Sequence, residues 1–144
     1  MEKKFDFSQI PSGWKFCFDR DCPMAGECLR YQTGLEVPAD RTSGSAVFPT
    51  ALKDGQCEFF RKDEKVTLAT GFLVADNPAM SDAFVRIRHS LTQYLGGNGT
   101  YYLYRNGKKW LSPRQQADIR QMFRRAGYKD EVEYGATRED YDFT

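Results

Sequence analysis

The sequence has little of what membrane and secreted proteins need. No stretch of the 144 residues approaches the roughly 18 consecutive apolar residues of a membrane span. The first residues, MEKKFDFSQIPSGW, are charged and include no apolar segment long enough for a signal peptide. We therefore expect a cytoplasmic protein without membrane contact, in a compartment where disulfides are rare and clustered cysteines more often bind a metal ion.

The usual signs of catalysis are also scarce. His89 is the one histidine, and no Ser-His-acid or Cys-His order is evident. The glycines of the GGNG run at 96–99 follow an expected helix instead of a strand, so they indicate a turn and not a phosphate-binding loop. We predict no catalytic residue, and we favour a binding module over an enzyme, which stays the least favoured alternative.

The composition is that of a globular protein with many aromatic residues. Hydrophobic residues make up 40%, charged residues 28% and aromatic residues 15% of the sequence, and many large rings argue against disorder. We divide the chain into a four-cysteine module over residues 1–62 and an α+β region with an acidic tail over residues 63–144. In the first part we expect only a strand at 14–18, a helix at 24–32 and a loop at 37–45.

The second part contains two clear helix signals. Asn77-Pro78 is typical of an N-cap followed by proline at the first helical position, and Gly96-Gly97 ends that helix. Ser112-Pro113 with Gln115 predicts a capping box, and Gly127 ends the second helix. Their expected buried faces share a helical spacing of apolar residues: Phe84, Ile87, Leu91, Tyr94 and Leu95 in the first, and Ile119, Met122, Phe123 and Ala126 in the second.

Strand signals lie around these helices. Residues 65–72 alternate with β-branched side chains, and residues 131–134 alternate as a last strand. Between the helices, Asn106-Gly107 separates the β-prone runs 100–105 and 108–111, which predicts a hairpin. The resulting order, β-α-β-β-α-β, is that of a ferredoxin-like sheet covered by two helices.

The four cysteines are the strongest chemical feature. Cys17, Cys22, Cys28 and Cys57 fall within 41 positions with the spacing C-x4-C-x5-C-x28-C. Four thiolates are a standard ligand set for a structural zinc ion, which closes a tetrahedron and leaves no open position for catalysis. The signal is weaker than paired C-x2-C knuckles, because the spacings between the first three cysteines are not common ones. An iron–sulfur cluster, which four thiolates can also hold although no known ferredoxin spacing matches, and four unrelated buried thiols remain as alternatives.

Several runs resemble an uncharacterised small Cys-motif protein family of Bacteroides and related bacteria, a domain of unknown function. The similarity covers about residues 14–143 and rests on the runs at 14–17 (WKFC), 28–30 (CLR), 55–60 (GQCEFF), 101–107 (YYLYRNG) and 111–116 (LSPRQQ), with Cys22, Phe123 and Gly127-Tyr128. The resemblance implies a bacterial cytosolic origin and a motif role for the cysteines. It implies no activity.

The charge is unevenly distributed. Residues 84–129 hold ten Lys or Arg and one acid, whereas residues 130–144 hold six acids and one Arg. Either the basic stretch binds an anionic partner, or the tail neutralises it. If it binds nucleic acid, we expect the contacts from its basic side chains and from two tyrosines on one sheet face, which would stack bases: Arg86, Arg88, Tyr102, Tyr104, Arg105, Lys108, Lys109, Arg120, Arg124 and Arg125.

The acidic tail supports a second function. Residues 138–143 (REDYDF) combine acids with aromatic rings and would dock on a protein partner as an extended peptide, or else fray. The sequence leaves the partner undecided between nucleic acid and protein, and it says nothing about the oligomeric state.

Overall fold

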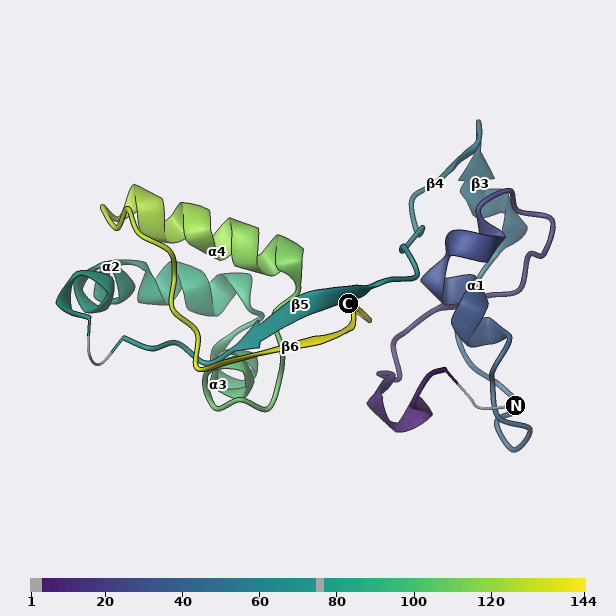
Figure 1. Cartoon of the computed structure of the whole chain (residues 1–144), viewed down its shortest axis with the longest axis horizontal. Coiled ribbons are helices and arrows are strands. Elements are labelled where there is room, and N and C mark those ends of the chain that lie inside the picture. The colour runs from purple at the N-terminus through teal and green to yellow at the C-terminus, as the bar shows by residue number, and fades with distance from the viewer. Residues whose placement is uncertain (1–3, 75–76) are drawn as a thin grey trace. The chain divides into compact units, whose positions relative to one another are not determined.

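The computed structural model describes residues 4–74 and 77–144 (Figure 1). The chain forms two compact units. Unit 1 comprises Met1–Glu64 with Phe143–Thr144, and unit 2 comprises Lys65–Asp142. Helices and small sheets occur together, so the α+β class expected from the sequence is confirmed.

Unit 1 is built from very short elements. They are η1 (Phe7–Gln9), β1 (Phe16–Cys17), η2 (Ala25–Glu27), α1 (Leu29–Gly34), β2 (Ala46–Val47), η3 (Pro49–Ala51), β3 (Leu52–Lys53) and β4 (Gln56–Cys57). β1 pairs with β2 in parallel, and β3 pairs with β4 antiparallel. Since each of these strands has two residues, backbone pairing alone holds little of this unit together.

Buried side chains around Trp14 supply the core of unit 1. Trp14 is 3% exposed, and its indole N–H donates to the buried hydroxyl of Thr33 at 3.1 Å. The ring of Phe143 meets Trp14 edge to face, with 5.2 Å between centroids. Phe143, although it lies near the end of the chain, therefore adds apolar contact to the core of unit 1.

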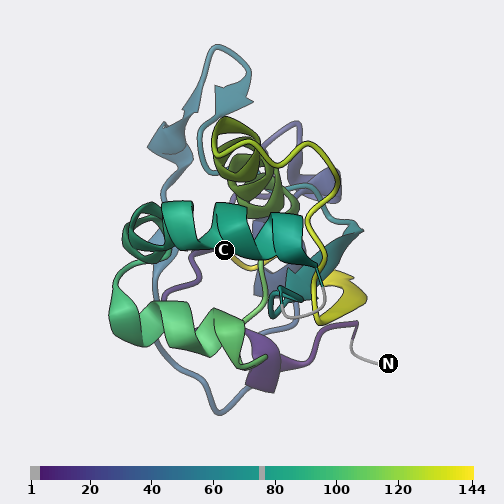
Figure 2. The ribbon, with the colours of Figure 1, turned by 90° about the vertical axis from the view of Figure 1, so that its left-hand side faces the viewer.

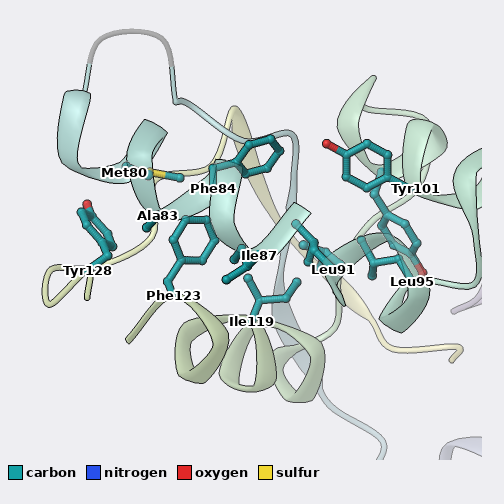
Figure 3. Packing of buried hydrophobic residues seen from close by; sticks show 12 residues of the cluster. Met80, Ala83, Phe84, Ile87, Leu91, Leu95, Tyr101, Ile119, Phe123 and Tyr128 are labelled. Atoms are coloured by element: carbon teal, nitrogen blue, oxygen red, sulfur yellow. The ribbon is translucent and has the colours of Figure 1, made fainter. Parts of the chain in front are cut away.

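The described residues of unit 2 form three regular helices. They are α2 (Pro78–Tyr94), α3 (Asn98–Arg105) and α4 (Pro113–Arg125). In Figure 2, α2 runs across the view between α4 above and α3 below, and it packs against both. The apolar faces of the helices meet in one buried cluster (Figure 3), made by Met80, Ala83, Phe84, Ile87, Leu91, Leu95, Tyr101, Tyr104, Leu111, Ile119, Phe123 and Tyr128.

The expected caps of the two long helices are confirmed. The side chain of Asn77 accepts the backbone N–H of Met80 at 3.2 Å, and Ser112 and Gln115 form the reciprocal capping box. The buried faces also agree with the apolar spacing, except that Tyr94 is 37% exposed. Local side-chain bonding fixes these helix starts, which is why the sequence revealed them.

A two-stranded ribbon completes unit 2. β5 (Lys65–Thr70) pairs antiparallel with β6 (Ala136–Tyr141), from Lys65 opposite Tyr141 to Thr70 opposite Ala136. On the other edge of β5, Leu111 makes a single bridge to Ala69. The expected strand at 65–72 is confirmed in most of its length.

The hairpin prediction is wrong. Residues 98–105 form helix α3, because Tyr101 and Tyr104 lie one helical turn apart and both are buried. Asn106-Gly107 ends that helix: Gly107 has φ 77°, its N–H donates to the carbonyl of Tyr104, and the N–H of Lys108 donates to that of Leu103. This is the Schellman C-cap, which uses the same left-handed conformation as a hairpin turn.

The ferredoxin-like order is therefore not formed. Between β5 and β6 the described residues contain three helices and the single Leu111 bridge instead of two further strands. The expected last strand at 131–134 is also displaced, since β6 begins at Ala136. Val132 and Tyr134 pack partly buried against the helical cluster, which explains their alternation without a strand.

Candidate functional site

The four cysteines come from separate segments of unit 1. Cys17 ends β1, Cys22 lies in the following turn, Cys28 is the N-cap residue of α1, and Cys57 ends β4. Backbone contacts hold these segments in place. The N–H of Leu29 donates to the carbonyl of Arg61 at 2.6 Å, which brings the end of this unit beside the start of α1.

All four cysteines line one cavity of about 30 Å³. Its remaining wall is mostly apolar and consists of Met24, Ala25, Tyr31, Val47, Phe59 and Phe60, with Asp19 and Arg30 as the charged members. A cavity of this size holds one or two water molecules. The structure thus brings together every cysteine that the sequence predicted as a ligand.

The thiols do not form a closed coordination shell as they stand. All four are free cysteines, and among residues 4–74 and 77–144 no group of three or more Cys, His, Asp or Glu side chains is placed so that it could hold a metal ion. Lining a common cavity and coordinating one ion are different conditions, and only the first is met. The thiols would have to turn toward one point to meet the second.

The pKa of Cys17 shows how the cavity affects the ionisation of this thiol. Burial raises the pKa of the Cys17 thiol, and the neighbouring Cys28, Asp19 and Cys22 raise that pKa further, because each would place negative charge near a thiolate. The backbone N–H of Asp19 acts in the opposite direction through a hydrogen bond to the Cys17 sulfur. These surroundings therefore favour the protonated form of Cys17, whereas a bound cation would favour its thiolate.

Arg30 is a cavity residue that the sequence interpretation missed. Its guanidinium lies 4.1 Å from the ring centroid of Trp14, its Nε donates to the carbonyl of Phe59 at 2.6 Å, and its Nη1 donates to that of Lys15 at 3.0 Å. These contacts hold a permanent positive charge in the wall of the cysteine cavity. The only signal in the sequence was its place two residues after Cys28.

The predicted base-stacking face does not exist in the form expected. Tyr102 and Tyr104 lie on helix α3 and not on a strand. Tyr104 is 4% exposed and belongs to the core, while Tyr102 is 43% exposed and accepts a hydrogen bond from Arg88 at 3.3 Å. The prediction that Tyr102 and Tyr104 stack bases on one sheet face is therefore wrong, because the two rings do not lie on a common open face.

The predicted basic residues have different roles in the structure. Arg86 donates to the carbonyl of Ala126 at 2.7 Å, at the C-terminal end of α4, and Arg120 pairs with Glu131 at 3.3 Å. Lys109 lies over the ring of Tyr104, with its Nζ 5.5 Å from the centroid. The other basic members of the set are exposed and make no ion pair with a described residue: Arg88, Arg105, Lys108, Arg124 and Arg125.

The acidic tail is not a free peptide. Most of the segment 138–143 belongs to β6, where Arg138 lies opposite Leu68 and pairs with Asp140 at 3.5 Å. The guanidinium of Arg138 also lies 4.6 Å from the ring centroid of Trp110. The alternative that this segment frays is therefore wrong for its strand residues, whereas docking on a protein partner stays a prediction.

Together these features define a two-unit α+β protein with a four-thiol cavity in one unit and an arginine-bearing helical surface in the other. The model of a family of unknown function, DUF6078, matches residues 1–143, and the chain belongs to this family. The resemblance to a family without an assigned activity is thereby confirmed. No curated protein and no solved structure matches the chain. In the part of the chain that the structure describes, no helix has the length and apolarity needed to cross a membrane.

Proposed function

We propose that the chain is a cytoplasmic binding module whose first unit is held together by a structural zinc ion on Cys17, Cys22, Cys28 and Cys57. One observation carries the proposal: cysteines from four segments line a single cavity of about 30 Å³. Zinc prefers four thiolates in a closed tetrahedron. If all four thiolates bind the ion, no ligand position stays open, which suits a structural ion better than a catalytic one.

The weakness of the backbone framework in unit 1 supports a stabilising role for the ion. β1, β2, β3 and β4 have two residues each, so the segments that carry the cysteines share few backbone hydrogen bonds. A structural zinc ion in a small domain contributes about 10 to 16 kcal/mol to the apparent free energy of folding at neutral pH. That contribution is of the same order as the whole stability of an ordinary domain.

Electrostatics also supports the proposal. A zinc ion with four thiolates carries two net negative charges, which an apolar wall disfavours. Arg30 in the cavity wall offsets part of that charge, and the N–H of Asp19 donates to the sulfur of Cys17. Outer contacts of this kind orient metal ligands and tune their basicity.

Metal analysis tests the proposal directly. Purified full-length protein should contain about one zinc per chain, and its four thiols should react slowly with a thiol reagent until a chelator is added. Cys57→Ser should lose the metal, whereas Phe48→Ser, an exposed change in the same unit outside the cavity wall, should keep it. The site would be rejected if the purified protein contained no metal and its four thiols reacted equally fast with and without chelator. If the protein contained iron and sulfide, the ligand would be an iron–sulfur cluster instead of zinc.

For the second unit we propose nucleic-acid binding. The observation that favours it is the set of exposed arginines and lysines without ion-pair partners among the described residues, since such side chains bind phosphates by releasing counterions. The alternative of a protein partner docked on the tail is less favoured, because residues 136–141 of the tail already pair with β5 and are not a free peptide. Binding to labelled nucleic acid that weakens steeply from about 50 to 200 mM salt is the expected result; absent or salt-independent binding would refute it.

A further inference from the structure

One face of α4 carries three exposed arginines that make no ion pair with a described residue. The exposed residues of this helix are Pro113, Arg114, Ala117, Gln121, Arg124 and Arg125. At about 100° per residue they fall within an arc of about 120°. Ile119 and Phe123, both 0% exposed, face the opposite side. These six exposed residues, three of them arginines, form the outer surface of the helix, which we call the α4 arginine face.

Little negative charge opposes this surface. Asp118 is the one acid of α4, it lies at the border of the α4 arginine face, and its carboxylate accepts the hydroxyl of Tyr94 at 2.6 Å. Arg120, on the other side of the arc, is paired with Glu131. The three arginines of the face make no ion pair with any residue in the described ranges.

The form of the surface selects the kind of nucleic acid. Single strands bind through aromatic rings on which bases stack, and the α4 arginine face contains no ring. A helix is about 10 to 12 Å across, which fits the roughly 12 Å major groove of B-DNA. The deep, narrow major groove of duplex RNA does not admit it.

The spacing along the helix fits the same target. Arg114 and Arg124 are ten residues apart, or about 15 Å along the axis, so they can reach phosphates on both walls of a major groove. Gln121 lies between them on the same face, and glutamine recognises adenine through two hydrogen bonds in that groove. Ala117, next to Gln121 on the arc, is small enough to let the helix approach the bases.

We propose that α4 lies in the major groove of duplex DNA, with Arg114, Arg124 and Arg125 on phosphates and Gln121 toward the base edges. This inference rests on the proposed nucleic-acid function of unit 2 and adds the partner and the binding element. No contact from unit 1 is required for it.

The test is DNA binding by the full-length protein, measured by fluorescence anisotropy on a labelled 20-base-pair duplex. Three phosphate contacts predict a slope near −2.7 for log K against log salt concentration, about 0.9 per contact. In Arg124→Gln/Arg125→Gln the slope should fall by about 1.8. At about 0.1 M salt the double variant should bind roughly 60-fold more weakly, because each lost contact costs about eightfold by counterion release alone.

A charge-matched control separates local contact from net charge. Lys62→Gln/Lys65→Gln removes the same two charges from exposed positions outside α4, and it should leave the slope near its original value. Both double variants change exposed side chains, and circular dichroism with thermal unfolding checks that each is folded. An equal effect of the two double variants would overturn the inference, since it would indicate charge alone.

Other ligands decide between failure of the inference and failure of the proposed function. Single-stranded DNA and duplex RNA should bind clearly more weakly than duplex DNA. If one of them binds as well or better, or if Arg124→Gln/Arg125→Gln leaves duplex binding unchanged, the α4 contact is wrong while nucleic-acid binding survives. If none of the three binds, the proposed function of unit 2 fails and the inference fails with it.

Discussion

Replacing Gly34 by alanine should damage the cysteine cavity through one backbone contact. Gly34 is the last residue of α1, and a Cβ there would lie 2.6 Å from the carbonyl oxygen of Cys17 and 3.2 Å from a ring carbon of Phe18. The first contact is with backbone, so the strand that carries Cys17 must move. Overpacking of this kind costs about 1 to 3 kcal/mol, against which alanine regains at most about 1 kcal/mol of helix propensity.

Gly26 provides the matched control in the same unit. A Cβ at Gly26 would meet nothing within 4 Å, so Gly26→Ala should be neutral or more stable by up to about 1 kcal/mol, because alanine has less freedom in the unfolded chain. The assay is urea unfolding of the zinc-loaded protein followed by Trp14 fluorescence in a Trp110→Phe background, together with zinc competition against a chelator. Gly34→Ala should lower both stability and zinc affinity. If both variants behave alike, the contact between α1 and Cys17 does not constrain the site.

Three further predictions concern single side chains and can be checked by urea unfolding. Thr33→Val leaves the buried indole N–H of Trp14 without its acceptor, so unit 1 should lose about 1 to 3 kcal/mol, whereas Thr50→Val at an exposed position should change little. Ser112→Ala removes the capping box of α4 and should cost about 1 kcal/mol, with exposed Ser90→Ala as the neutral control. Tyr134→Phe removes a buried hydroxyl that has no partner among the described residues, so unit 2 should gain about 1 kcal/mol; Tyr128→Phe, which loses hydrogen bonds to Asn77 and Glu131, should instead lose about as much. Burial raises the pKa of Tyr134 from its ordinary value of 10.0 to about 12. The contribution of this neutral, buried side chain to stability is therefore present below pH 10 and is lost as pH rises through 12. Tyr134→Phe should flatten that alkaline decline, and an unchanged decline would refute the assignment.

The starts of α2 and α4 were predictable because their signals are local. Asn77 and Ser112 bond to backbone groups within three residues, so a short window of sequence contains both partners. The apolar spacing behind each cap then gave the buried face, and only Tyr94 departed from it. Its hydroxyl reaches Asp118 on α4, a contact between helices that no spacing rule contains.

The hairpin at Asn106-Gly107 failed because two structures use the same backbone conformation. A type I′ turn and a Schellman cap both need a residue with positive φ, and glycine provides it in either case. The decision came from Tyr101 and Tyr104, whose burial on one helical face outweighed the β-propensity of the run around them. The alternation of the run had paired Tyr102 with Tyr104, which the helix separates.

The last strand was misplaced for a different reason. β6 runs through Ala136–Tyr141, and its first four residues are exposed, so it has no apolar alternation to detect. Its position follows from the register with β5, where Lys65 lies opposite Tyr141. Such a long-range pairing is not encoded in any local pattern.

The sequence indicated which cysteines would come together, but not what surrounds their cavity. Composition alone singled out the four thiols, and the structure places all of them around one cavity. The contribution of Arg30 depends on two other segments, since Trp14 and Lys15 on one and Phe59 on the other hold its guanidinium. A sequence read in order gives no sign that these residues meet.

The separation into units makes the two proposals independent. The buried cluster that supports α4 lies wholly within unit 2, and the cysteine cavity lies wholly within unit 1. Metal removal should therefore loosen the cavity segments while α4 keeps its packing on α2, because no residue of that cluster lines the cavity. If chelation abolished DNA binding as completely as Arg124→Gln/Arg125→Gln, the α4 arginine face would not be sufficient, and unit 1 would have to supply contacts to the DNA.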